Sequence, residues 1–262
     1  MPPPAELLVV HSAQQLAEDA AARLVATLAS AQRAHGTASL VVTGGGILEQ
    51  TLRALRSLAA RDAVDWSKVS LWWGDERFVP PDSGERNDLA AFRAVFDDLP
   101  LDPANVHRMP AAGGTFGQDA RAAAEAYAAD LARAVPPRQG DDDIPHFDVV
   151  LLGIGPDGHC ASLFPEHPGV YETGAAVIAV HNSPKPPPTR ISLTFRALDA
   201  ANEIWFIASG EPKAQAVAMA LSGAGRVQVP AAGPRGRHRT LWLIDREAAA
   251  KLSPDRYRPP VA

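Results

Sequence analysis

Cysteine is almost absent from this chain of 262 residues, and so is any excess of positive charge. The single cysteine, Cys160, excludes an internal disulfide framework and a cysteine-rich zinc site, so we expect a reducing, cytoplasmic setting. The net charge of −5 disfavours binding to nucleic acid or to an anionic membrane, because both need a basic surface. No apolar run reaches membrane-spanning length, and the N-terminal segment lacks the features of a signal peptide. Any anion site must therefore be a local cluster. We also expect a monomer, although composition and charge do not determine the oligomeric state.

Several common catalytic motifs are also missing. The sequence has no H-E-x-x-H motif, no paired cysteines and no loop of spaced carboxylates, so metal binding has little support. The absence of a G-x-S-x-G motif disfavours serine-hydrolase chemistry. The glycine turn TGGG (43–46) lacks the lysine of a P-loop, which disfavours a nucleoside triphosphate.

A dinucleotide-binding motif is imitated by Gly153 to Gly158, which fit the pattern G-x-G-x-x-G after an apolar strand. That motif needs a long helix directly after the glycines. Pro165 and Pro168 leave room for only about two turns there, because each proline removes a helical hydrogen bond. The acidic residue that should follow the next strand is missing as well, so a nicotinamide cofactor is not expected.

Short β-branched or aromatic runs alternate with helical patterns along the whole chain, and 46% of the residues are hydrophobic. This alternation predicts an α/β fold of one domain, residues 1–262, with a mostly parallel central sheet and helices on both faces. The expected strands are 7–10, 39–43, 69–73, 147–153, 175–180, 190–195, 203–209 and 240–245. The expected helices are 12–36, with Ser12 and Gln15 as a capping box and Gly36 as the end, then 47–60, 86–97, 117–134 and 211–221. Residues 135–146 and 222–239 are expected to be loops rather than interdomain linkers.

Glycines and charged side chains follow two of these strands. Gly44, Gly45 and Gly46 stand at the start of a helix, where exposed amide groups and the helix dipole favour a phosphate, although a simple tight turn is an equal interpretation. Asp75 and Arg77 follow the next strand and alternate onto one side, so both can point into a cleft, with Glu76 pointing away. The alternative is a solvated turn. Asn87, farther along, is interpreted as a local helix cap.

The segment 147–168 carries the strongest signal, because an apolar strand runs into a glycine-rich turn with Asp157 and His159 two residues apart. A histidine there suits a general base, and Asp157 suits its orientation. The alternative is a structural histidine bonded to the backbone. Cys160 is interpreted as a packing residue, because adjacent side chains seldom face each other as a catalytic dyad requires.

Three further cations complete the expected site. Lys185 and Arg190 flank a proline run, which on its own would be typical of a linker or a peptide ligand. Lys213 follows Pro212 at a helix start and, with Arg190 and the glycine turn, predicts a phosphate-binding site. The arginines of residues 233–239 and the aspartates 141–143 are expected to be solvated surface residues.

Taken together, five segments closely resemble the 6-phosphogluconolactonase family, which shares a Rossmann-like α/β fold with the glucosamine-6-phosphate deaminases. They are TGGG (43–46), WWGDERFVP (72–80), LLGIGPDGHCASLFP (151–165), SPKPPPTRISLT (183–194) and SGEPKAQAV (209–217). The resemblance implies hydrolysis of 6-phospho-D-glucono-1,5-lactone to 6-phospho-D-gluconate, the second step of the oxidative pentose phosphate pathway, without metal or cofactor.

Roles for the named residues follow from the same resemblance. It implies that His159 activates water, that Asp157 orients His159, and that Arg77, held by Asp75, binds the substrate or stabilises the oxyanion. Arg190, Lys213 and the glycine turn would hold the phosphate, with Lys185 as a further member of that group.

The sequence departs from the family pattern at Gly46-Ile47, where a hydroxyl residue is expected after the glycines, and at Cys160, where threonine is frequent. Backbone amides must then carry more of the phosphate binding. Two alternatives remain: a deaminase-like isomerase, disfavoured because Glu166 lies beyond Pro165 and no nearer acid follows His159, and a sugar-phosphate sensor without chemistry.

Overall fold

The computed structural model describes residues 3–136 and 142–257, and its centre is a sheet of parallel strands. These strands are β1 (Glu6–Val10), β2 (Ala38–Val42), β3 (Val69–Trp73), β5 (Val106–His107), β6 (Val149–Leu152), β9 (Glu203–Ala208) and β10 (Arg239–Asp245). Their order in the sheet is β1-β10-β9-β6-β2-β3-β5, and every pair is parallel. The predicted α/β fold with a mostly parallel central sheet is confirmed.

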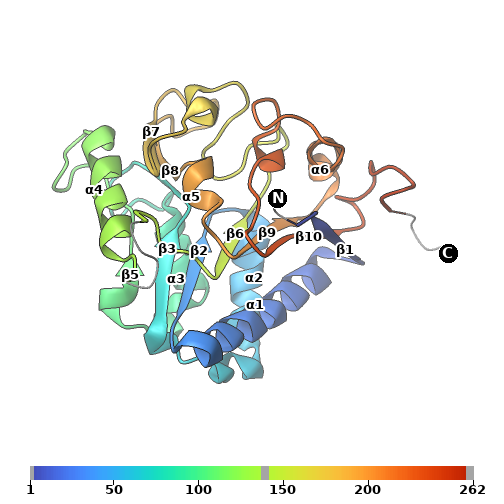
Figure 1. The fold of residues 1–262 in the computed structure, drawn as a ribbon, viewed down its shortest axis with the longest axis horizontal. Helices are drawn as coiled ribbons and strands as arrows, with labels where there is room; N and C mark the ends of the chain where they lie inside the picture. Colours follow the sequence, from blue (N-terminus) through green and yellow to red (C-terminus); the bar gives the residue numbers. More distant parts are fainter. Residues whose placement is uncertain (1–2, 137–141, 258–262) are drawn as a thin grey trace.

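The helices are α1 (Ala13–His35), α2 (Gly46–Ser57), α3 (Asn87–Ala94), α4 (Ala120–Arg133), α5 (Phe195–Leu198) and α6 (Ala214–Leu221). The predicted ends of α1 are confirmed: the Ser12 hydroxyl accepts the amide of Gln15, and Gly36 ends the helix at a φ of 87°. The Gln15 side chain accepts the amide of His11, one residue before the position that a capping box uses. In Figure 1, α1 and α2 occupy the lower half and α5 the upper half, with the central strands between them.

A second sheet stands apart from the first and corrects the prediction for residues 175–180 and 190–195. It contains β4 (Asp75–Arg77), β7 (Val177–Val180) and β8 (Arg190–Leu193), in the order β4-β8-β7. All of its pairs are antiparallel, so β7 and β8 are not central parallel strands. The reason is the short connection 181–189, because a parallel pair needs a crossover of about a dozen residues or more.

The antiparallel pairing has a consequence for the site. Strand β4 follows β3 after Gly74 and pairs with β8, which places Arg77 opposite Arg190 and Asp75 opposite Ser192. Two segments that are more than a hundred positions apart in the sequence are thereby joined just beyond the carboxyl end of β3.

The order of the central sheet also creates a topological switch between β2 and β6. From β2 the chain adds β3 and β5 on one side, and from β6 it adds β9 and β10 on the other. Loops leave the carboxyl ends of two such neighbouring strands in opposite directions, which opens a crevice where α/β proteins bind ligands. The glycine turn after β2 and the loop after β6 flank this crevice.

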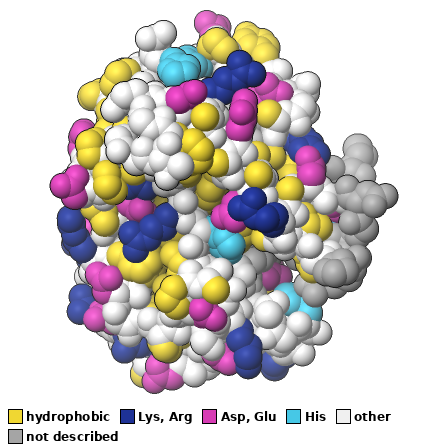
Figure 2. Space-filling model, turned by 90° about the vertical axis from the view of Figure 1, so that its left-hand side faces the viewer, with side chains coloured by type: hydrophobic (Ala, Val, Ile, Leu, Met, Phe, Trp, Pro, Cys, Tyr) yellow, Lys and Arg dark blue, Asp and Glu magenta, His cyan; other side chains and the backbone are white. Residues whose placement is uncertain are grey.

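Two findings concern the possible partners considered in the sequence analysis, nucleic acid and membranes. Lys or Arg and Asp or Glu side chains are interspersed on the face shown in Figure 2, so this face presents no basic field of the kind that nucleic acid requires. Within residues 3–136 and 142–257, no helix has both the length and the apolar character needed to cross a membrane.

Candidate active site

A cavity of about 480 Å³ lies at the carboxyl ends of the central strands, in the crevice beside β2 and β6. The predicted site residues that line it are Gly44, Gly45, Gly46, Asp75, Arg77, His159, Lys185, Arg190 and Lys213. Asp157 does not line the cavity, but it is hydrogen-bonded to His159. The fold therefore gathers into one place residues that come from five separate segments of the sequence.

The glycine turn forms the wall beside β2. Gly45 has a φ of 134°, a left-handed conformation that L side chains rarely adopt, and Gly46 begins α2. The first amide groups of a helix have no partner within it, and the residues of this turn line the cavity, so these amides are potential hydrogen-bond donors to an anion. The hydroxyl of Thr43 donates to the carbonyl of Leu151 at 3.1 Å, which takes its proton away from the cavity. Backbone groups thus carry the hydrogen-bonding capacity of this wall.

His159 lies on the loop after β6, and its ring makes a polar contact with Asp157 rather than with the backbone. Nδ1 is 2.6 Å from Asp157 Oδ1, and the ring also packs against Phe164 at 4.8 Å between centroids. An ionised carboxylate only accepts hydrogen bonds, so in the neutral imidazole a hydrogen on Nδ1 would face Asp157 and the lone pair would lie on Nε2. Within the part of the chain that the structure describes, Nε2 has no hydrogen-bond partner. That geometry is what a general base requires.

Asp157 is ionised, and its side chain is 34% exposed. Burial alone would raise its pKa, but the hydrogen bond with His159 and the nearby charges of His159 and Lys185 outweigh burial and bring the pKa well below its ordinary value. Lys185 Nζ is 3.2 Å from Asp157 Oδ1 and 3.1 Å from His159 Nδ1. The structure therefore places Lys185 against the Asp157–His159 pair, while its predicted contact with phosphate stays a prediction.

The absence of a side chain at Gly155 makes room for the side chains of His159 and Asp157. A Cβ atom at this position would lie 1.9 Å from His159 Nδ1 and 2.3 Å from Asp157 Oδ1. Real Cβ atoms never approach so closely, so the side chains of the pair occupy the space that any other residue would fill. The glycine pattern after β6 thus serves close packing of His159 and Asp157, and no helix follows it up to Pro165.

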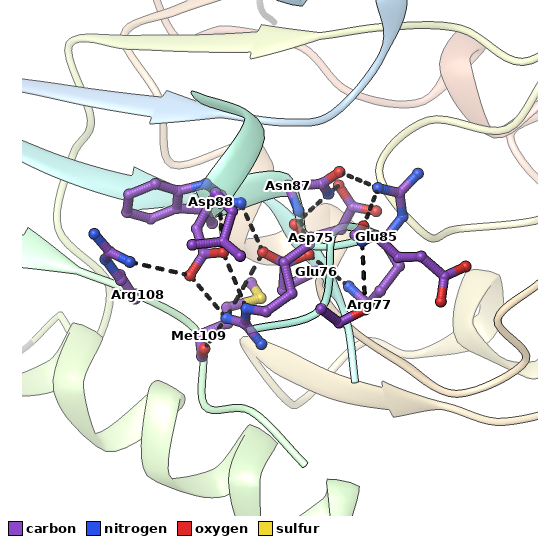
Figure 3. A network of polar contacts seen from close by, with 12 residues as sticks. Asp75, Glu76, Arg77, Glu85, Asn87, Asp88, Arg108 and Met109 are labelled. Atoms are coloured by element: carbon purple, nitrogen blue, oxygen red, sulfur yellow. Dashed lines mark hydrogen bonds and ion pairs between the residues drawn. The ribbon is translucent and has the colours of Figure 1, made fainter. Parts of the chain in front are cut away.

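Arg77, Asn87 and Asp75 form the opposite wall, shown in Figure 3. Arg77 Nη1 donates to Asn87 Oδ1 at 2.6 Å and to the carbonyl of Glu85 at 2.7 Å. Asn87 Nδ2 in turn donates to the carbonyl of Asp75 at 3.0 Å. The interpretation of Asn87 as a local cap is wrong, because Arg86 is the N-cap of α3 and the Asn87 side chain lines the cavity. Sequence patterns gave no signal for this role beyond its position after the charged run.

The solvated-turn alternative for this charged run is also excluded. Asp75 is 4% exposed and accepts the hydroxyl of Ser162 at 2.7 Å, and Glu76 is only 1% exposed. Glu76 points away from the cavity as expected, but it points into the protein rather than into solvent.

The two remaining cations differ in how far they are already engaged. Arg190 is 5% exposed and donates to the carbonyls of Lys185, Pro186 and Pro187, so its guanidinium braces the proline loop. Lys213 is half-buried, and its side-chain ammonium group makes no hydrogen bond or ion pair with the described residues. Burial, and after it the charge of Lys185, lowers the pKa of Lys213. Lys213 is therefore the cation most available to an incoming anion.

Three lesser expectations have mixed outcomes. Cys160 is 1% exposed and burial raises the pKa of its thiol, which confirms the packing interpretation. Asp143 pairs with Arg196 at the surface, whereas Asp141 lies outside the described residues. In the loop before β10, Arg237 is exposed as expected, but Arg235 is half-buried, and burial lowers its pKa.

The chain is similar in sequence and fold to several known proteins. The chain matches the family model for glucosamine-6-phosphate isomerases/6-phosphogluconolactonase over residues 11–242. It is 57% identical to a 6-phosphogluconolactonase of Streptomyces coelicolor over 96% of this chain and 97% of that one. For a 6-phosphogluconolactonase of Mycobacterium tuberculosis the identity is 50%, over 88% and 91%. The solved structure of 6-phosphogluconolactonase from Trypanosoma brucei is similar with a TM-score of 0.79 at 27% identity, covering 97% of this chain and 100% of that one.

Proposed function

The chain belongs to the glucosamine-6-phosphate isomerase/6-phosphogluconolactonase family, and from this premise we propose that it hydrolyses 6-phospho-D-glucono-1,5-lactone to 6-phospho-D-gluconate. The observation that carries the proposal is the His159–Asp157 contact of 2.6 Å, which engages Nδ1 and leaves Nε2 without a partner among the described residues. The same cavity holds a cation whose ammonium group is unengaged, Lys213. A base and an anion site in one crevice suit a substrate with a reactive ester at one end and a phosphate at the other.

In the proposed reaction, His159 Nε2 accepts a proton from water as its oxygen attacks C1 of the lactone. The carbonyl electrons move to the oxygen, and the guanidinium of Arg77, fixed by Asn87, stabilises the negative charge that develops. The C1–O5 bond then breaks, and the imidazolium returns the proton to O5. Asp157 keeps the ring oriented and stabilises its charged form.

Binding of the phosphate is assigned to Lys213 and to the amides of Gly44, Gly45 and Gly46. Arg190 donates to three carbonyl groups through Nε and Nη2, so we assign it mainly to holding the loop that carries Lys185. Its Nη1 lies 3.5 Å from the Ser162 hydroxyl. Since Gly46-Ile47 replaces the usual hydroxyl residue, the turn offers only main-chain donors.

A deaminase-like isomerase is the alternative on the same scaffold. It is disfavoured because no acidic residue follows His159 within reach of the cavity: Glu166 lies beyond Pro165, and its amide is bonded to the carbonyl of Val227. Among the described residues that line the cavity, Asp75 alone carries a carboxylate, and that carboxylate is buried and accepts a hydrogen bond from Ser162.

A direct assay distinguishes these activities. We expect the purified protein to accelerate the opening of freshly prepared 6-phosphogluconolactone above the spontaneous rate, measured by coupling the product to 6-phosphogluconate dehydrogenase. We expect no ammonia from glucosamine 6-phosphate under the same conditions. Ammonia release without lactone hydrolysis would favour the isomerase, and binding without either reaction would favour the sensor.

The phosphate assignment predicts the effect of Lys213→Ala. A hydrogen bond to a charged group contributes about 1.5–3 kcal/mol, so we expect KM to rise by roughly 10- to 150-fold with kcat little changed. Lys251→Ala, which removes an exposed lysine outside the cavity, is the matched control. Equal KM values in both variants would contradict the assignment.

A further inference from the structure

Glu76 is a buried carboxylate whose partners among residues 3–136 and 142–257 are three backbone amides and one arginine. Oε1 accepts the amides of Arg77 at 2.8 Å and Asn87 at 2.7 Å, and Oε2 accepts the amide of Asp88 at 2.9 Å. Arg86 Nη2 lies 3.7 Å from Oε2. Figure 3 shows Glu76 between the strand that carries Asp75 and Arg77 and the segment that carries Asn87 and Asp88.

Those amides belong to two different elements. The amide of Arg77 is part of β4, while the amides of Asn87 and Asp88 open α3. A helix start leaves its first amides without helical partners, and here Glu76 caps two of them from outside the helix. The carboxylate therefore fixes the distance between β4 and the start of α3. The Arg77 and Asn87 side chains that face the cavity extend from these two points.

The surroundings of Glu76 raise its pKa, so the carboxyl group is only partly ionised near neutral pH. Burial raises its pKa to about 7, against the opposing effects of Arg86 and of the amides of Asn87 and Asp88, while the charge of Asp88 raises it further. Arg86 itself is held by a two-pronged pair with Asp88 and by the carbonyl of Met109. Tyr127 on α4 and Arg190 on β8 are the other titratable groups that interact with Glu76.

We infer that Glu76 is a positioning residue of the active site: its carboxylate, by capping α3 against β4, holds the Arg77–Asn87 pair in the orientation that the reaction uses. This inference rests on the proposed function for the role of Arg77. A protonated carboxyl or an amide would place a hydrogen against a backbone N–H and lose part of the cap. Loss of the cap would displace Arg77 and Asn87 while the rest of the cavity stays in place.

Glu76→Gln tests the inference. At pH 8 we expect kcat/KM to fall about tenfold, as the loss of one charge-assisted hydrogen bond allows. In an Arg77→Ala background the same change should have almost no further effect, because residues that act through one group are not additive. Asp148→Asn is the matched control: Asp148 is also buried and accepts a backbone amide, from Ser39, but it lies outside the cavity. Additive losses in the double variant would overturn the inference.

The pH dependence separates positioning from stability. Because the folded pKa of Glu76 is raised, the stability that its protonation contributes is fully present below the unfolded pKa, near 4.5, and is lost as pH rises through about 7. Lowering the pH thus favours the fold but weakens the cap. We expect the ratio of wild-type to Glu76→Gln activity to fall from about tenfold at pH 8 towards one at pH 6. A ratio that stays constant between pH 6 and pH 8 would contradict the inference.

Amide hydrogen exchange provides a readout that needs no substrate. We expect the amides of Arg77, Asn87 and Asp88 to exchange faster in Glu76→Gln than in Asp148→Asn, by NMR at equal overall stability. Unchanged exchange would refute the cap. If exchange changes but the wild-type protein opens no lactone, the proposed function fails while the structural role of Glu76 stands.

Discussion

Replacing His159 by alanine should lower kcat for lactone hydrolysis by about 10²–10⁴-fold, the range that general-base catalysis supplies. KM should change little, because the proposed phosphate contacts lie on the glycine turn and Lys213. The rate is best measured in the coupled assay, with the spontaneous opening of the lactone subtracted. This is the largest effect that the proposed mechanism predicts for a single side chain.

A matched control for this variant is His167→Ala. His167 packs against the same Phe164 ring as His159 but does not line the cavity. Its replacement should leave kcat within about threefold of the wild type, as expected for a change outside the catalytic group. Unchanged turnover in His159→Ala would remove the histidine from the mechanism, whatever the control does.

Gly155→Ala should reduce kcat almost as strongly, by about 10²-fold or more, although it removes no functional group. The added Cβ would lie 1.9 Å from His159 Nδ1 and 2.2 Å from Cε1, so the ring must move away from Asp157. The backbone itself tolerates alanine, because the φ of Gly155 is not among the positive values. The loss should therefore come from displacement of the base rather than from misfolding, which circular dichroism and thermal unfolding check.

Gly153→Ala is the corresponding control two residues earlier. A Cβ there would meet Leu48 Cδ1 at 3.7 Å and the carbonyl of Gly44 at 3.8 Å, both ordinary van der Waals contacts. We expect a loss of less than about threefold in kcat, in line with a tolerated small substitution. Equal losses at both positions would mean that the glycines matter for the fold of the loop and not for the His159–Asp157 geometry.

Local signals in the sequence predicted the elements that depend on them. The ends of α1 follow from Ser12 and Gly36, whose side-chain hydroxyl and backbone conformation act within one turn of the chain. Six of the seven central strands follow from apolar runs that need no knowledge of their neighbours, whereas the two-residue strand β5 was not predicted. The pairing of β4 with β8 could not be predicted in this way, because it joins Asp75–Arg77 to Arg190–Leu193 across a long sequence separation.

In the candidate site, too, the roles that depend on local sequence could be predicted, and those that depend on long-range contacts could not. The glycine turn, Arg77 and Lys213 were predictable members of the cavity because they come after β2, β3 and β9, and the carboxyl ends of parallel strands meet on one side of a sheet. Lys185 and Arg190 reach the cavity from the antiparallel sheet instead, which the sequence did not predict. Asn87 and Glu76 were assigned wrongly or incompletely because their roles depend on how α3 docks against β4. In the sequence, D-E-R followed by a proline loop resembles a solvated turn, and only the folded chain buries Glu76 against three amides.

The central claim is that water is activated at His159 while the phosphate is held at the other end of the cavity. A crystal structure with 6-phosphogluconate bound tests this most directly. We predict that the carboxylate of the product lies within hydrogen-bond distance of His159 Nε2, about 3 Å, and that its phosphate contacts Lys213 and the amides of Gly44 to Gly46. A product bound with its phosphate beside His159, or outside this cavity, would contradict the account.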